Sequence, residues 1–243
     1  MKLFIYFMGR DGLGLLLAVA ALVVALLTVK EVSAMGGVTN TSYASETFTP
    51  SNGSIGTTGG YVYTFNVSTQ EKTYRWVGLW GNATGEVALR TASNNFYTWP
   101  LSTITSGSIL YATTDISGID PTNFENTTGY ADLEDADTAY GYDSSVIDSI
   151  NSTYDSGGSF QSPSMQYAIY VNTTTVDSWT NYMIPKAASI SATDDIVWAV
   201  SINPQQTAFN GQKADYELLI PENEEAGDGE GTVTTYYLWM ELN

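Results

Sequence analysis

Alternating apolar and polar residues constrain the fold of this chain more than any other feature. In YVYTFNVS, residues 61–68, Tyr61, Tyr63, Phe65 and Val67 share one side, which is the period-2 pattern of a half-buried strand. We expect about eight further strands, joined by connections rich in Gly, Ser, Asn and Asp, and the chain therefore predicts an all-β fold, an antiparallel β-sandwich over residues 61–243. These further strands are expected at residues 72–80, 86–91, 95–99, 107–113, 166–172, 195–202, 213–220 and 233–242.

Two connections have the composition of hairpin turns. The stretch 81–85 (GNATG) has glycine at both ends and predicts that strands 72–80 and 86–91 pair as a hairpin. The acidic stretch 222–230 predicts a hairpin loop between the last two strands. Glu217 and Glu241 alternate with apolar neighbours and are expected on the solvent face.

The six tryptophans divide by their local context. Trp76 and Trp198 are each expected to share a strand face with apolar or small residues two positions away, which favours a place in the core. Trp99 precedes a proline at a strand end and Trp179 lies among polar residues, so both are expected to be exposed. Exposed aromatic rings can stack on sugars, and this favours a carbohydrate- or polymer-binding module as one alternative function.

A long acidic insertion, residues 115–163, interrupts the strands, and a short helix is expected within residues 144–152. Carboxylate oxygens are the ligands that Ca²⁺ prefers, but the spacing here fits no calcium-loop motif. A solvated acidic loop and a Ca²⁺ site both remain open, and no other cofactor is expected. The candidate metal ligands are Asp132, Glu134, Asp135 and Asp137.

The first 34 residues predict export. Lys2 and Arg10 precede an uncharged apolar run, residues 13–29, which would span about 25 Å as a helix, slightly short of the hydrocarbon core of about 30 Å. Cleavage after Ala34, retention as a membrane anchor and use as a pilin-like filament leader all remain open. Residues 35–60 are rich in Gly, Ser and Thr and predict a flexible arm before an extracellular or cell-surface domain.

Composition excludes several classes of function. The chain has neither histidine nor cysteine, which rules out His-dependent nucleophilic triads, Cys–His systems and the usual zinc sites. The formal net charge of −18 disfavours nucleic-acid partners. Paired carboxylates could support glycoside hydrolysis, but none has a recognisable catalytic partner, so we expect no enzymatic activity.

Seven Asn-x-Ser/Thr sequons predict glycosylation in a host that has this pathway. Several fall at positions expected to face solvent, such as hairpin tips, polar strand faces and the acidic insertion. The candidate acceptors are Asn40, Asn52, Asn66, Asn82, Asn126, Asn151 and Asn172.

The motif RWVGLWGNATG, residues 75–85, follows the YVYTFNV strand and precedes Phe96-Tyr97-x-Trp99 and a last strand YYLWMEL. In these features the chain resembles a loose group of archaeal secreted surface proteins with an RWxGxWGNxTG hairpin, a resemblance that implies location and architecture only.

The leading hypothesis is therefore a non-enzymatic, glycosylated cell-surface structural or adhesive protein that assembles by strand exchange. In this hypothesis the arm 35–58 of one copy pairs with the sheet of the next. The alternatives are a surface-glycan- or polymer-binding module and a pilin-like filament subunit.

Overall fold

The computed structural model describes residues 56, 58–62, 73–91, 93–101, 104–126, 133–223 and 234–243. The chain divides into two units, residues 1–34 and 35–243, and all of the described residues belong to the second unit. The expected leader, most of the expected arm and most of the expected strand 61–68 lie outside the described residues. Among the residues that are described, no helix is both long and apolar enough to cross a membrane.

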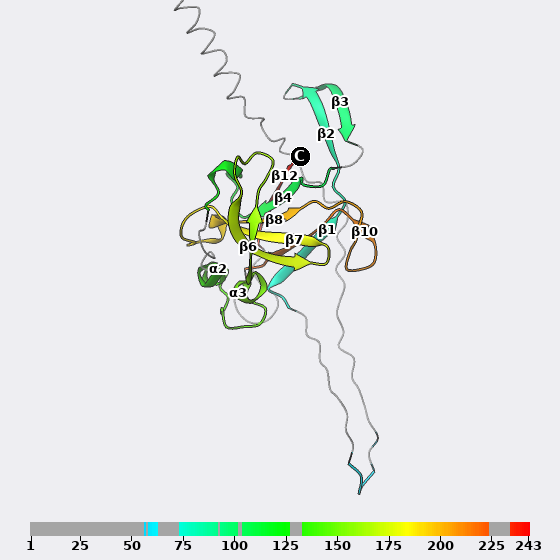
Figure 1. Cartoon of the computed structure of the whole chain (residues 1–243), viewed down its shortest axis with the longest axis vertical. Helices are drawn as coiled ribbons and strands as arrows, with labels where there is room; N and C mark the ends of the chain where they lie inside the picture. The colour runs from blue at the N-terminus through cyan, green and yellow to red at the C-terminus, as the bar shows by residue number, and fades with distance from the viewer. Residues whose placement is uncertain are drawn as a thin grey trace, which may run out of the picture. The chain divides into compact units, whose positions relative to one another are not determined.

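A six-stranded antiparallel sheet, in the order β12-β4-β8-β7-β6-β5, forms the centre of the fold (Figure 1). The secondary structure of the described residues is mostly strand in antiparallel sheets, which confirms the expected β-rich class for this part of the chain. The strands expected within residues 107–113, 166–172, 195–202 and 233–242 are present, whereas β5 and β7 were not expected. The bounds are β4 Ile109–Thr113, β5 Ser156–Phe160, β6 Ile169–Val176, β7 Trp179–Pro185, β8 Ile196–Ser201 and β12 Tyr237–Glu241.

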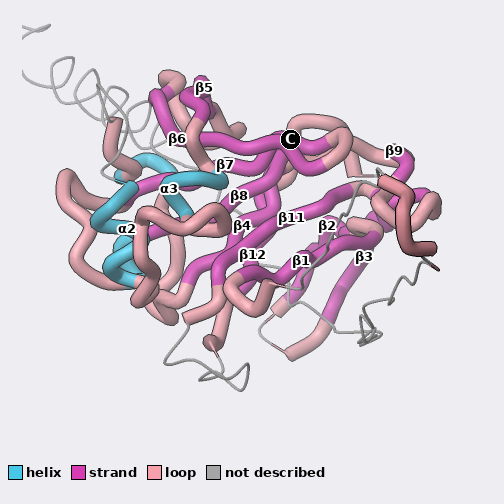
Figure 2. The backbone as a smooth tube through the Cα atoms, turned by 90° about the horizontal axis from the view of Figure 1, so that it is seen from below, coloured by secondary structure: helices cyan, strands magenta, loops and turns pink. Residues whose placement is uncertain are grey.

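A second antiparallel pair, β1 (Trp76–Gly81) with β11 (Tyr216–Pro221), covers one face of this sheet. Leu218 and Ile220 of β11 pack into one apolar cluster with Met183 of β7 and Trp198 of β8. Figure 2 shows β11 and β1 running alongside the strands of the larger sheet. The main core therefore lies between the sheet and this pair.

Asn181 of β7 links the two layers through hydrogen bonds. Its side-chain amide donates to the carbonyl oxygen of Glu217 at 3.0 Å, and its Oδ1 accepts the backbone N–H of Leu219 at 2.8 Å. Because Asn181 is fully buried, these bonds satisfy polar groups that would otherwise destabilise the core.

The opposite face of the sheet carries a second apolar cluster. Tyr111, Val171 and Val197 point to this side, where Phe124 and Phe160 pack against Tyr111. Phe124 directly follows the 3₁₀ turn η1 (Pro121–Asn123), which Asp120 caps by accepting the N–H of Thr122. The acidic insertion therefore contributes to the core as well as to the surface.

Both expected hairpins are wrong. β1 pairs with β11 and not with β2 (Gly85–Arg90), which instead pairs with β3 (Asn95–Leu101). The last long strands do not pair with each other either, because β12 pairs with β4. A two-residue pairing of β9 (Gln206–Thr207) with β10 (Lys213–Ala214) and the turn η2 (Thr193–Asp195) complete the fold.

The described residues of the insertion 115–163 form regular secondary structure. They include α2 (Leu133–Ala139), α3 (Ile150–Thr153) and the sheet strand β5. The helix expected within 144–152 is thus a single turn near the end of that range. Leu133 and Ala136 of α2 and Ile150 of α3 pack into the main core, so the insertion also closes one end of it.

Candidate functional site

The β2–β3 hairpin presents an exposed apolar face. Leu89 lies directly opposite Tyr97, and Trp99 lies two residues beyond Tyr97, so the three share one side of the two-stranded ribbon. Leu89 is 55% exposed, Tyr97 56% and Trp99 49%. We call these three residues the hairpin face.

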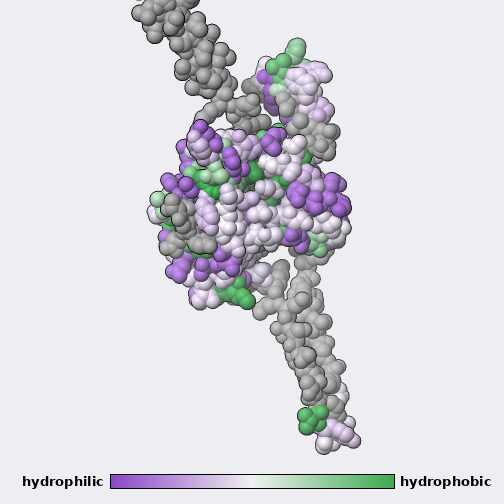
Figure 3. Space-filling model, in the orientation of Figure 1, coloured by the Kyte–Doolittle hydropathy of each residue, from purple (hydrophilic) through white to green (hydrophobic). Residues whose placement is uncertain are grey.

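The two rings of the hairpin face lie against each other, with centroids 4.7 Å apart and planes tilted by 59°. The register shifts between Leu89 and Arg90, and Phe96 is the extra residue on the opposite strand β3. The Phe96 side chain is 84% exposed. A bulge at this place redirects a side chain instead of continuing the ladder. Figure 3 shows hydrophobic surface toward the free end of the hairpin, among hydrophilic residues.

The hairpin pairs with no other strand among the described residues, and Figure 1 shows it standing apart from the six-stranded sheet. Its turn is closed by Thr91 N–H donating to Asn94 O at 2.8 Å and by Asn94 N–H donating to the Thr91 hydroxyl at 3.1 Å. An isolated two-stranded hairpin is marginally stable in water, and exposed apolar clusters mark interaction surfaces. The hairpin face is therefore the candidate functional site.

The sequence predicted both strands of this hairpin, but the periodicity of each strand alone does not show that the two pair. Residues 86–91 and 95–99 were each expected as strands, and Trp99 was expected to be exposed, which is confirmed. Pairing of these two segments with each other is what brings Leu89 beside Tyr97 and Trp99.

The acidic residues proposed as Ca²⁺ ligands are not equivalent in the structure. Glu134 and Asp135 lie on the exposed side of α2, Asp137 is fully buried, and Asp132 lies outside the described residues. Asp137 Oδ1 accepts the N–H of Ile150 at 2.6 Å and Oδ2 accepts the N–H of Asn151 at 3.2 Å, so it caps α3. In the described part of the chain, no group of three acidic residues is placed to hold a metal.

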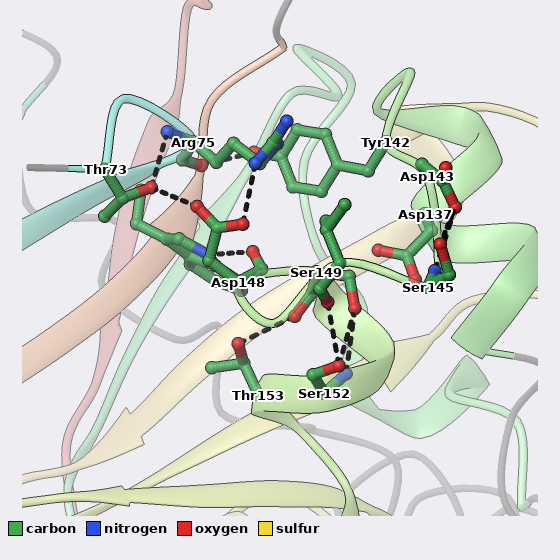
Figure 4. Close-up of polar contacts among 12 residues, drawn as sticks. Thr73, Arg75, Asp137, Tyr142, Asp143, Ser145, Asp148, Ser149, Ser152 and Thr153 are labelled. Carbon is green, nitrogen blue, oxygen red and sulfur yellow. Dashed lines mark hydrogen bonds and ion pairs between the residues drawn. The ribbon is translucent and has the colours of Figure 1, made fainter. Parts of the chain in front are cut away.

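A polar cluster beside α3 has a structural role (Figure 4). The Arg75 guanidinium and the Thr73 hydroxyl both donate to the Asp148 carboxylate at 2.6 Å. The Tyr142 hydroxyl contacts the carbonyl oxygens of Arg75 and Glu222. These bonds attach the chain before β1 and the chain after β11 to the α2–α3 region.

Glu217 and Glu241 are both buried, so their expected solvent-face position is wrong. Glu217 does point away from the main core, but the loop between β9 and β10 covers it, and its Oε1 accepts the N–H of Phe209 at 2.8 Å. Glu241 lies beneath Tyr111 and Ser164, which donate to its two carboxylate oxygens. The nearby β9–β10 loop covers Glu217, and residues distant in sequence cover Glu241. The periodicity of a single strand reports neither contact.

The tryptophans proposed for sugar binding differ in their placement. Trp198 is buried as expected, and Trp76 packs partly buried against the same core. Trp179 is only 1% exposed, so its expected exposure is wrong. Its indole N–H donates to the carbonyl oxygen of Asp215 at 2.9 Å, which satisfies the one polar atom of the buried ring.

The sequons also differ in accessibility. Asn82 and Asn126 are exposed and Asn151 is half-buried, while Asn40, Asn52 and Asn66 lie outside the described residues. Asn172 is 0% exposed in β6, and its side-chain N–H donates to Tyr154 O at 3.2 Å. The Asn172 amide is therefore inaccessible in the folded domain.

Comparison with protein-family models, with curated protein sequences and with solved structures found no match for this chain.

Proposed function

We propose that this chain is a non-enzymatic, extracellular cell-surface glycoprotein with a structural or adhesive role, which self-associates through its β2–β3 hairpin. The observation that carries the proposal is the hairpin face, where Leu89, Tyr97 and Trp99 are each about half exposed on a ribbon that pairs with no other described strand. A second copy offering the same face would bury these side chains, which is the symmetric arrangement of most homo-oligomers.

Other features support this assignment. The apolar leader and the resemblance to archaeal surface proteins favour a place outside the cytoplasm, and the net charge of −18 favours solubility there. The six-stranded sheet with β1–β11 packed on it supports a β-sandwich as the domain architecture. The exposed positions of Asn82 and Asn126 support glycans on its surface.

A second candidate function is binding of surface glycans or polymers by the same hairpin. The tilted pair of Tyr97 and Trp99 favours it, because neighbouring aromatic rings can stack on successive sugar faces. With Trp179 buried, this candidate depends on Trp99 and Tyr97 alone.

Sedimentation velocity over a range of concentrations tests the proposal. We expect the wild-type chain to form oligomers and the triple variant Leu89→Ser/Tyr97→Ser/Trp99→Ser to remain monomeric, because it loses the apolar area that would be buried. A matched control is Ile147→Ser/Tyr167→Ser, which removes two other exposed apolar side chains. Unchanged oligomers in the triple variant, or equal loss in the control, would refute the proposed interface.

A glycan-binding assay separates the second candidate. Binding that is lost in Trp99→Ala while the oligomer persists would favour the glycan-binding module. Loss of the oligomer without any glycan binding by the wild-type protein would favour self-association.

A further inference from the structure

One carboxylate oxygen in the β11 region has no hydrogen-bond donor among the described residues. Glu217 is 3% exposed, and while its Oε1 accepts the Phe209 N–H, its Oε2 is buried and receives no hydrogen bond from them. A buried carboxylate oxygen without a hydrogen bond destabilises the fold, so this atom needs either a proton or a bound cation as its partner.

The nearby polar group is a second carboxyl. Asp177 is the first residue of the two-residue turn between β6 and β7, and its side chain lies within hydrogen-bonding reach of Glu217. Asp177 is exposed, so solvent reaches the pair from the side of the β6–β7 turn. Two carboxyls this close need a positive charge between them, which is either a shared proton or a bound cation.

No basic side chain supplies that charge in the described part of the chain. The ion pairs there join Arg75 to Asp148 and Lys186 to Asp115. The Lys213 ammonium donates to the Thr207 hydroxyl. Burial and the neighbouring Asp177 raise the pKa of Glu217, so the two carboxyls by themselves disfavour the doubly charged state.

We propose that Glu217 and Asp177 bind a hard divalent cation such as Ca²⁺, with water completing its coordination. Oxygen ligands of this kind suit Ca²⁺, and the acidity of the chain concentrates cations near its surface. The site differs from the acidic group on α2, because its ligands come from β11 and the β6–β7 turn. A bound cation would fasten that turn to β11, next to the Asn181 bonds that join the same two layers.

Thermal unfolding of the full-length protein tests this site. After removal of metals with a chelator, CaCl₂ at neutral pH is compared with NaCl of equal ionic strength. We expect calcium at roughly tenfold above its dissociation constant to raise the midpoint by about 3–6 °C.

Two variants test whether the calcium-dependent rise of the midpoint depends on Glu217 and Asp177. In Glu217→Gln the amide oxygen still accepts the Phe209 N–H and the amide NH₂ can donate to Asp177, so the fold is kept and the calcium shift is lost. Asp177→Asn tests the other ligand at an exposed turn where φ is +48°, a conformation that Asn accepts readily. The control Glu134→Gln/Asp135→Asn removes two exposed charges and is expected to keep the full shift.

Two results would overturn the proposal. One is a calcium shift that persists in both Glu217→Gln and Asp177→Asn, which would place the bound ion elsewhere. The other is a midpoint that rises on acidification and not with calcium, which would mean that the pair holds a proton alone.

Discussion

The hydroxyl of Tyr111 donates a hydrogen bond of 2.7 Å to Oε2 of Glu241, and both side chains are buried. Tyr111 lies on β4 and Glu241 ends β12, the edge strand of the large sheet. Ser164 donates its N–H to the other carboxylate oxygen. One acidic side chain thus fastens the C-terminal strand to the sheet and to the loop before β6.

Tyr111→Phe should lower the free energy of unfolding by about 1–3 kcal/mol, because it leaves a buried carboxylate oxygen without its donor. Urea unfolding measures this. Tyr97→Phe is the matched control, since the Tyr97 side chain is exposed on the hairpin, and should change stability by less than about 0.5 kcal/mol. Equal stability of the two variants would show that the Tyr111–Glu241 bond contributes nothing net.

The positions of the strands in this fold were easier to predict than the pairing between strands. The apolar run 196–200 correctly located β8, with Trp198 in the core, because burial of both strand faces leaves a continuous apolar segment. It could not show that β1 pairs with β11, more than a hundred residues away, instead of with its neighbour β2. A short Gly-rich connection permits a hairpin but does not determine strand pairing.

Polar residues inside the core prevented the sequence pattern from predicting strand β7. β7 buries Trp179, Asn181 and Met183 on one face, and the polar Asn181 between them interrupted the apolar pattern. Its burial is stabilised by bonds to Glu217 and Leu219, which exist only once β11 packs on the sheet. Likewise, the hairpin face depends on the pairing of Leu89 with Tyr97, which neither strand predicts alone.

The Lys186–Asp115 ion pair gives a pH-dependent prediction. The hydrogen bond from Lys186, at 2.5 Å, is the main cause that lowers the pKa of Asp115 to about 2. A lowered folded-state pKa stabilises the fold above the unfolded-state pKa, and this contribution is lost as pH falls toward about 2. Both side chains are about one-fifth exposed, so the contribution at neutral pH should be at most about 1 kcal/mol.

Lys186→Met should therefore be less stable than the wild type at neutral pH, with a difference that shrinks below about pH 4 and is lost below about pH 2. Urea unfolding across this range measures the difference. Lys213→Met, which removes a lysine bonded only to the Thr207 hydroxyl among the described residues, should show no such convergence. A constant difference for Lys186→Met would mean that packing, and not the ion pair, explains its effect.

Glycan occupancy should follow accessibility. In protein from a glycosylating host, peptide mass spectrometry should find glycans on Asn82 and Asn126 and none on Asn172. Asn126 Oδ1 accepts the N–H of Tyr170, and this bond leaves the Asn126 amide nitrogen available for a sugar. A glycan found on Asn172 would require β6 to be open at that position, contrary to the structure.

Deleting residues 35–58 separates two routes of assembly. If the arm of one copy completes the sheet of the next, the deletion should abolish oligomers that the hairpin variant retains. If self-association uses the hairpin face, the deletion should leave the oligomers unchanged by light scattering, while Leu89→Ser/Tyr97→Ser/Trp99→Ser removes them. We expect the second result, because the hairpin face exposes three large side chains in a single copy and their burial would drive association. Loss of oligomers in the deletion variant alone would instead assign assembly to the arm.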